Sequence, residues 1–285
     1  MKLNLFKITI ALLLLLLAPW AHATINCTIS STGFSTTYVP TSVSPNINQG
    51  SFTLICTKDL LDSGTTDYTV TINNGANPTG IQNRATLSAN TISYDTYQTS
   101  GCSAVWGNGA GESITGSMNS NSNKTVNYWG CITVLGQYVP AGTYSDTVTM
   151  TVSYTNTGVL SGPTPRTATN TFPVSIINPA VCSITSIDNV AFGTYVAFRA
   201  TALVAPNSNI VLNCTPSLSY NLALDANSGV VAGLNYSLSL SATTSLGSGP
   251  GQTHTIAGTM PANQAGTCAT GSCSNSDPRT LTITY

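Results

Sequence analysis

Hydrophobic and polar residues alternate with a period of two along much of the chain, which is the pattern of a β-strand with one buried face. The stretch 169–180, T-N-T-F-P-V-S-I-I-N-P-A, shows this pattern clearly, just before Cys182. Its apolar positions Phe172, Val174 and Ile176 alternate with Thr, Ser or Pro. Apolar residues do not recur at helical spacing in the mature part of the chain, so the pattern predicts an all-β protein.

Shorter segments of the same kind predict strands in both halves, separated by turn clusters such as Asn73-Asn74-Gly75. The predicted strands are 51–57, 68–73, 125–128 and 147–154 in the first half, and 209–214, 220–225, 236–240 and 280–285 in the second. Short strands with turn-rich connections favour a β-sandwich.

The two halves form an internal repeat. C-T-I-S begins at Cys27 and C-S-I-T at Cys182, and 22 residues separate Phe from Cys in both Phe34–Cys56 and Phe192–Cys214. The repeats also end alike, because Ser145-Asp146 leads to Tyr154 as Ser276-Asp277 leads to Tyr285 without a gap. Residues 155–181 fall between the two units, which predicts two similar domains and a segment between them.

Residues 1–23 have the features of a secretory signal peptide, because about 11 apolar residues follow a short positive start and are too few to span a bilayer. Ala21-His22-Ala23 offers the cleavage site. The remaining 262 residues carry 6 basic and 9 acidic side chains. Such a sparse charge gives no basic patch for nucleic acid and fits an exported β-protein whose polar surface is mostly hydroxyls and amides.

All eight cysteines lie in the mature region, and in an exported chain an even number favours disulfides over a metal site. The strand layout pairs Cys27 with Cys56 and Cys182 with Cys214, and it leaves Cys102–Cys131 and Cys268–Cys273 as pairs specific to each domain. Four cysteines in one domain allow three pairings, so other connectivities stay open.

Catalytic chemistry has little support. His254 is the single histidine of the mature chain and lies in a predicted strand, while Asp95 and Glu112 are isolated acids in turn-rich sequence. The glycine-rich stretch 107–111 lacks the Lys-Ser/Thr of a phosphate loop. We therefore expect no catalytic residue, no cofactor and no metal.

Three stretches carry a family resemblance: C-S-I…F-G-T-Y in 182–195, V-W-G-N-G in 105–109, and V-P-A-G-T-Y-S-D-T-V-T-M-T-V-S-Y in 139–154. They resemble spore coat protein U domains, the subunits of archaic chaperone–usher pili, and the resemblance covers nearly the whole mature chain. It implies an immunoglobulin-like sandwich that lacks its last strand. A chaperone, and then the N-terminal arm of the next subunit, supplies that strand.

A structural pilin of this family carries its donor arm before its first cysteine, whereas only Thr24 to Asn26 precede Cys27 here. We therefore expect the arm-like strand 169–178 to close the first domain, 24–178, in cis through Phe172, Val174 and Ile176. Pro173 should then lie at an end or an edge of that strand, because proline cannot donate to the ladder.

The second domain, 179–285, stops at Tyr285, so we expect no strand to be left for it. Leu281, Ile283 and Tyr285 should then border an open acceptor groove. About four or five exposed aliphatic positions, each contributing roughly 1.5–3 kcal/mol when buried, would leave such a domain in need of a partner strand.

These features predict the tip adhesin of a chaperone–usher pilus, exported through the periplasm to the cell surface and acting in attachment and biofilm formation. The expected partners are a periplasmic chaperone, an outer-membrane usher, the next pilin subunit and a host or abiotic surface. Apolar loops containing Leu60-Leu61 and Val134-Leu135 are candidate adhesive contacts, although they also fit caps of the sandwich ends. The alternatives are a minor structural or adaptor pilin without a ligand and a secreted carbohydrate-binding module.

Overall fold

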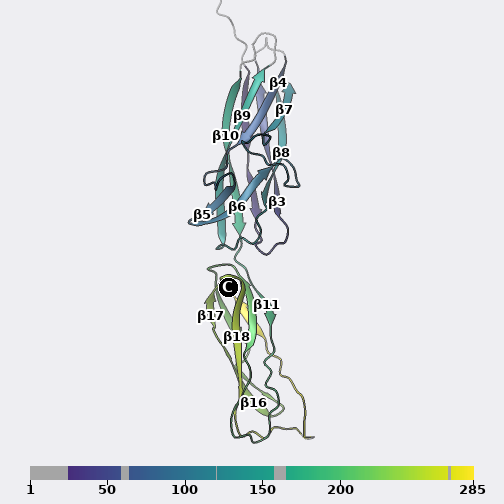
Figure 1. The fold of residues 1–285 in the computed structure, drawn as a ribbon, viewed down its shortest axis with the longest axis vertical. Helices are drawn as coiled ribbons and strands as arrows, with labels where there is room; N and C mark the ends of the chain where they lie inside the picture. Colours follow the sequence, from purple (N-terminus) through teal and green to yellow (C-terminus); the bar gives the residue numbers. More distant parts are fainter. Residues whose placement is uncertain (1–24, 59–63, 120, 157–164, 269–270) are drawn as a thin grey trace, which may run out of the picture.

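The computed structural model describes residues 25–58, 64–119, 121–156, 165–268 and 271–285. Within them the chain forms nineteen strands and no helix. The all-β prediction is confirmed. Figure 1 shows two elongated β-structures placed end to end and joined by one short connection. No helix in the described residues is long and apolar enough to cross a membrane.

The first domain contains ten strands that form two facing layers. The pairing order β1-β3-β8-β6 makes one layer, β7-β4-β9-β10-β2 makes the other, and β5 pairs with both β6 and β9. The strands are β1 (Asn26–Ser31), β2 (Phe34–Thr37), β3 (Asn46–Thr57), β4 (Thr65–Ile72), β5 (Asn83–Leu87), β6 (Asn90–Tyr97), β7 (Ile114–Asn119), β8 (Ser122–Ile132), β9 (Gly142–Asn156) and β10 (Arg166–Asn178).

The second domain repeats this plan with fewer strands. One sheet has the order β11-β13-β18-β16-β15, with β12 paired to β18, and the other has the order β17-β14-β19. The strands are β11 (Cys182–Ile187), β12 (Leu203–Val204), β13 (Ser208–Cys214), β14 (Ser219–Leu224), β15 (Ser228–Val231), β16 (Leu234–Leu240), β17 (Thr244–Leu246), β18 (Gly249–Met260) and β19 (Leu281–Thr284).

Each domain has its own core, made by the inward residues of both layers. The two cores differ in closure. In the first, most contributing apolar residues are fully buried, whereas in the second many stay half-buried, including Val190, Phe192, Leu281 and Ile283. The half-buried residues gather where the second domain has fewer strands than the first.

The first domain has a distal end and a junction end. At the junction end, Gly142 at the start of β9 pairs with Asn178 at the end of β10, and Pro179 follows directly. The side-chain hydroxyl of Thr215 in the second domain donates to the carbonyls of Pro179 and Val181, 3.1 Å away in each case. The connection is therefore tied to the second domain by hydrogen bonds.

Candidate functional site: a strand position filled in the first domain and open in the second

In the first domain, β10 lies between β9 and β2 and fills the centre of the core. It pairs antiparallel with β9 over its whole length and parallel with β2 from Val174 onward. The side chains of Phe172, Val174 and Ile176 point inward and are at most 1% exposed. β10 thus follows the whole first repeat in the sequence, yet it packs into the core of the domain that this repeat forms.

Aromatic rings anchor β10 in the core. The ring of Phe172 lies 6.3 Å from Trp106, nearly parallel to it, and 5.4 Å from Tyr128. Trp106 is buried and its indole Nε1 donates to the carbonyl of Val70 at 3.0 Å. Burial raises the pKa of Tyr128 to about 12. The tryptophan of V-W-G-N-G therefore belongs to the core and contacts the inserted strand.

Pro173 lies in the interior of β10 and not at its end, but on the β2 side it stands at a local edge, because no ladder has begun there. The pairing with β9 runs through Pro173, opposite Thr147, and pairing with β2 begins one residue later. The carbonyl of Pro173 lies against Gly33, where a Cβ would be 1.8 Å from the oxygen. The proline nitrogen thus faces the side on which no β-ladder has yet begun, so no ladder hydrogen bond is lost.

In the second domain the corresponding position is open. The order β17-β14-β19 matches β7-β4-β9 of the first domain, and β19 pairs only with β14 among the described residues. No strand of the described residues pairs with the outer edge of β19, where β10 pairs with β9 in the first domain. The outer edge of β19 therefore presents unpaired backbone groups, which are a template for another strand.

The side chains along this edge show the same difference. The inward residues of β9 are buried, whereas the matching residues on β19 and directly after it are more exposed. Leu281 and Ile283 are half-buried, and Tyr285 is 59% exposed; their buried counterparts on β9 are Met150, Val152 and Tyr154. An apolar row is thus left beside the open edge.

A second border of the open position is the segment that corresponds to β2. Residues 192–195, F-G-T-Y, match F-S-T-T of β2, yet residues 188–202 contain no strand. Phe192 and Tyr195 pack partly buried against the core, while Val196 and Phe198 are mostly exposed. Because β2 pairs in parallel with β10, its counterpart has no strand to pair with.

A polar cluster lies at one end of the open position. Tyr236 donates its hydroxyl to Asp277 at 2.5 Å, and Arg279 donates from Nε to Tyr236 at 2.6 Å and from Nη2 to Asp277 at 2.5 Å. In the first domain Tyr94 donates to Asp146 at 2.7 Å in the same way, but Val148 replaces the arginine. Each of the two carboxylates thus accepts a hydrogen bond from a tyrosine. At the position of the apolar Val148 in the first domain, the second domain has the cationic Arg279.

The first half of the last strand is also incomplete. β9 has 15 residues and β19 has four. Residues 276–280, which correspond to 145–149 in the first half of β9, form no strand in the structure. Since β10 pairs with all of that half in the first domain, the missing neighbour accounts for the shorter strand.

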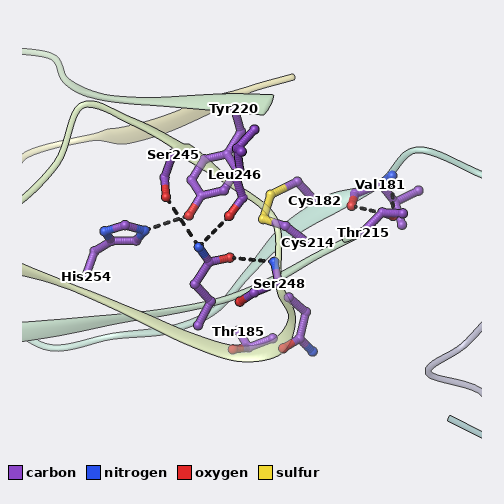
Figure 2. The surroundings of a disulfide bond; sticks show 12 residues. Val181, Cys182, Thr185, Cys214, Thr215, Tyr220, Ser245, Leu246, Ser248 and His254 are labelled. Atoms are coloured by element: carbon purple, nitrogen blue, oxygen red, sulfur yellow. Dashed lines mark hydrogen bonds between the residues drawn. A yellow bond between two sulfur atoms is a disulfide. The ribbon is translucent and has the colours of Figure 1, made fainter. Parts of the chain in front are cut away.

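Figure 2 shows the junction end of the second domain, where the Cys182–Cys214 disulfide joins β11 to β13. The amide of Val181 donates to the hydroxyl of Thr215 at 3.1 Å. The hydroxyl of Tyr220 lies 2.6 Å from Nε2 of His254. The histidine of β18 therefore has a structural partner, a tyrosine of β14 in the facing sheet.

The structure contains disulfides between Cys27 and Cys56, Cys102 and Cys131, Cys182 and Cys214, and Cys268 and Cys273. The first and third join the first strand of each repeat to the strand paired with it. No cysteine is left free. The described residues contain no group of three or more His, Cys, Asp or Glu placed to hold a metal ion.

The two candidate adhesive loops belong to opposite ends of the first domain. Val134 and Leu135 are 42% and 43% exposed, but their loop follows β8 at the junction end, where Gln137 donates to the carbonyls of Ser93 and Val134. Leu60 and Leu61 lie outside the described residues, between β3 and β4, whose adjoining ends are distal. The structure therefore places Val134 and Leu135 at the junction end and does not bring them together with the distal ends of β3 and β4.

Sequence comparison of the repeats did not single out Arg279 or the unpaired segment 188–202. The signal for Arg279 was present, because the gap-free alignment of the two ends places it opposite Val148. No local signal distinguishes 192–195 from β2, since the difference comes from a missing neighbour.

A family model for the spore coat protein U domain matches residues 12–151 and 168–267, which is most of the chain. The chain belongs to the spore coat protein U domain family. The second match begins within β10, so the sequence of that strand goes with the second repeat although the strand folds into the first. None of the curated proteins gives a significant match.

Several solved structures are similar to the chain at low identity. A chain in the CsuC–CsuE chaperone–tip adhesion subunit pre-assembly complex, from archaic chaperone–usher Csu pili of Acinetobacter baumannii, has a TM-score of 0.49 and 15% identity, covering 90% of this chain and 100% of that one. The CupB6 tip adhesin from Pseudomonas aeruginosa has a TM-score of 0.39 and 10% identity, covering 91% and 94%. Likenesses at this level do not assign a function.

Proposed function

We propose that this spore coat protein U domain protein is the tip adhesin of a chaperone–usher pilus. The observation that carries the proposal is the unequal treatment of one strand position, which β10 fills in the first domain and which has no occupant beside β19 in the described part of the second. The first domain is closed and free to contact a surface. The second accepts a strand from the next subunit by β-strand addition.

The occupant of the open position follows from the first domain. β10 is a strand with alternating apolar residues that directly precedes the first cysteine of a repeat. The incoming segment should therefore be the arm that precedes the first cysteine of the next subunit, bound antiparallel to β19. Before assembly, a strand of a periplasmic chaperone fills the same position, and an outer-membrane usher then exchanges the two.

The direction of such an arm fits a linear fibre. β10 ends at the junction end of the first domain, and the second domain begins there. By the same geometry, an arm paired with β19 would run away from the junction and end near Asp277, at the far end of the second domain. The connection between the two domains thus repeats the connection expected between subunits.

A tip position fits the use of β10 inside the chain. In a shaft subunit, a strand of this kind would fill a neighbouring molecule, whereas here it is consumed by the first domain. Attachment and biofilm formation are then tasks of the distal end of the first domain, with Leu60-Leu61 as the candidate contact. The chain would reach the cell surface through the periplasm after removal of a signal peptide at 1–23.

Behaviour during purification tests the assembly part of this proposal. The mature chain produced alone should aggregate or be degraded, and co-production with a pilus chaperone should give a soluble one-to-one complex. An added peptide with the sequence of the shaft subunit's arm should displace the chaperone. A stable monomer that needs neither chaperone nor peptide would contradict the proposal.

Attachment is tested by two matched double variants. Leu60→Ser with Leu61→Ser should reduce binding of piliated cells to plastic or host material without changing fibre assembly. Val134→Ser with Leu135→Ser, at the junction end, should leave attachment unchanged. Equal attachment by cells with the unmodified protein and with either double variant would show that neither loop contacts the surface. That result would favour an adaptor pilin without a ligand.

A further inference from the structure

Outward side chains on one sheet of the first domain are almost uniformly hydroxyls. On β9, every odd-numbered position from 143 to 155 is Ser or Thr, and each is exposed or half-buried. The strand register places Thr69 and Thr167 on either side of Ser153, Thr71 and Thr169 on either side of Thr151, and Thr171 beside Thr149. We call these five residues, with the odd positions 143–155, the hydroxyl face.

The hydroxyl face lies on three adjacent strands, and β4, β9 and β10 are side by side in Figure 1. Its seven positions on β9 span about 40 Å, because alternate residues of a strand are separated by about 6.7 Å. These hydroxyls belong to exposed or half-buried residues, so they can donate to and accept from a partner.

Regular composition distinguishes this face from the opposite one. The outer side of β1, β3 and β8 mixes Asn and Gln with Ile47 and Ile55, which are 48% and 44% exposed. On β4, β7, β9 and β10, by contrast, the exposed charged residues among those described are Asp67 and, at the first position of β10, Arg166. The outer side of β1, β3 and β8 also carries hydroxyls, such as Thr53 and Thr125, but they are interrupted there by amide and apolar side chains.

A shallow hollow adjoins the distal end of the hydroxyl face. It has a volume of about 560 Å³ and is lined by outward residues of three strands, among them Asp67, Thr115, Ser117, Ser153 and Thr155. Asp67 pairs with Ser117 on one side and with Thr155 on the other. A carboxylate surrounded by hydroxyls accepts charge-assisted hydrogen bonds from hydroxyl donors, which are stronger than neutral ones.

We propose that the hydroxyl face binds a neutral, extended polysaccharide that lies along β9, with one sugar unit in the hollow at Asp67. Hydroxyls that both donate and accept match the hydroxyls of a sugar. Along β9 the hydroxyl face carries no cationic side chain, so it gives an anionic polymer no electrostatic attraction there, and the exposed Arg166 lies only at its distal end. The long, open shape fits a chain that makes many weak contacts better than it fits a small molecule.

This inference does not rest on the pilus assignment, because it needs only an exposed first domain. Affinity gel electrophoresis of the mature chain in its soluble complex with a pilus chaperone, with the chaperone alone as a blank, tests it through hydroxyethyl cellulose, a neutral polymer, and through alginate, an anionic one. The neutral polymer should retard the protein and alginate should not. No retardation by hydroxyethyl cellulose, or equal retardation by both polymers, would overturn the proposal.

Matched variants locate the site. Thr71→Val, Thr151→Val and Thr169→Val together remove one row of hydroxyls and keep the β-branched shape. They should weaken apparent affinity about tenfold or more, since each hydrogen bond contributes about 0.5–1.5 kcal/mol. Thr53→Val with Thr125→Val, on the opposite face, serves as the control and should bind as the unmodified chain does. Equal affinity of the triple variant and the control would overturn the proposal.

The hollow has its own test. Asp67→Asn keeps the size of the side chain but removes its charge, and it should weaken binding to hydroxyethyl cellulose several-fold. Unchanged unfolding midpoints would show that both domains stay folded in every variant. Unchanged affinity of Asp67→Asn would overturn the placement of a sugar in the hollow.

Discussion

The ring of Phe172 stacks on the ring of Trp106, with centroids 6.3 Å apart and planes inclined by 10°. Trp106 lies in the first family match, whereas Phe172 lies between the two repeats and within the second family match. The interior of the first domain is thus completed by a residue whose sequence goes with the second. This contact explains how the first domain closes without a partner.

Replacing Phe172 by Ala should destabilise the first domain by about 3–5 kcal/mol, the usual cost of removing a buried aromatic ring. Thr171→Ala, one residue away on the exposed side of β10, should change stability by about 0.5 kcal/mol or less. Chemical denaturation followed by tryptophan fluorescence measures both. Similar effects of the two variants would contradict the placement of β10 in the core.

Gly33 tests the close approach of the turn before β2 to β10. Its φ of +76° is left-handed, and a Cβ there would collide with the carbonyl oxygen of Pro173. Gly193 has a similar φ of +71°, but a Cβ would meet nothing within 4 Å. Gly33→Ala should therefore cost more than Gly193→Ala, whose penalty should be about 1 kcal/mol for the backbone alone. Equal losses of unfolding free energy would show that β10 does not approach Gly33.

Local pattern predicted the strand class and the repeat, because alternation and matched spacings are properties of the sequence itself. It did not predict strand length. Residues 147–154 were expected to form a strand, and β9 extends to 142–156 because β10 pairs with all but its last two residues. The matching residues 192–195 and 34–37 differ in structure because β2 has β10 beside it and its counterpart has no such neighbour. Pairing across the sheet, which no local pattern records, decides such cases.

The open edge of the second domain predicts an effect that depends on the partner strand. Leu281→Ala should cost less in the free chain than Met150→Ala at the matching buried position, which should cost about 2–5 kcal/mol. In the complex with a chaperone or donor peptide, the cost of Leu281→Ala should rise toward that of Met150→Ala. Thermal unfolding with and without the partner measures this difference. If the loss of stability in Leu281→Ala is the same with and without the partner, the partner strand does not bind beside β19.

Asp95 predicts a pH dependence of the first domain. Burial raises the pKa of its carboxyl to about 6, despite a hydrogen bond from the amide of Asn83 that lowers it. Between about pH 4 and 6 the folded chain therefore holds a proton that the unfolded chain releases, so stability falls as pH rises through this window. Asp95→Asn should remove this fall, which we expect to be about 1 kcal/mol because solvent partly screens the carboxyl.

Denaturation curves of the first domain at pH 4 and at pH 7 measure the effect. The unmodified chain should lose more unfolding free energy between the two values than Asp95→Asn does. Identical losses in the two proteins would mean that this carboxyl titrates alike in the folded and unfolded chain.

The most direct measurement of the central claim is calorimetric unfolding of a mature chain that carries a copy of residues 155–178 directly after Tyr285. The copy repeats the loop and strand that close the first domain. We expect the copy to raise the unfolding midpoint of the second domain alone, and a copy with Ser in place of Phe172, Val174 and Ile176 to leave it unchanged. A second domain that unfolds at the same temperature with either copy, or with neither, would contradict an open strand position beside β19.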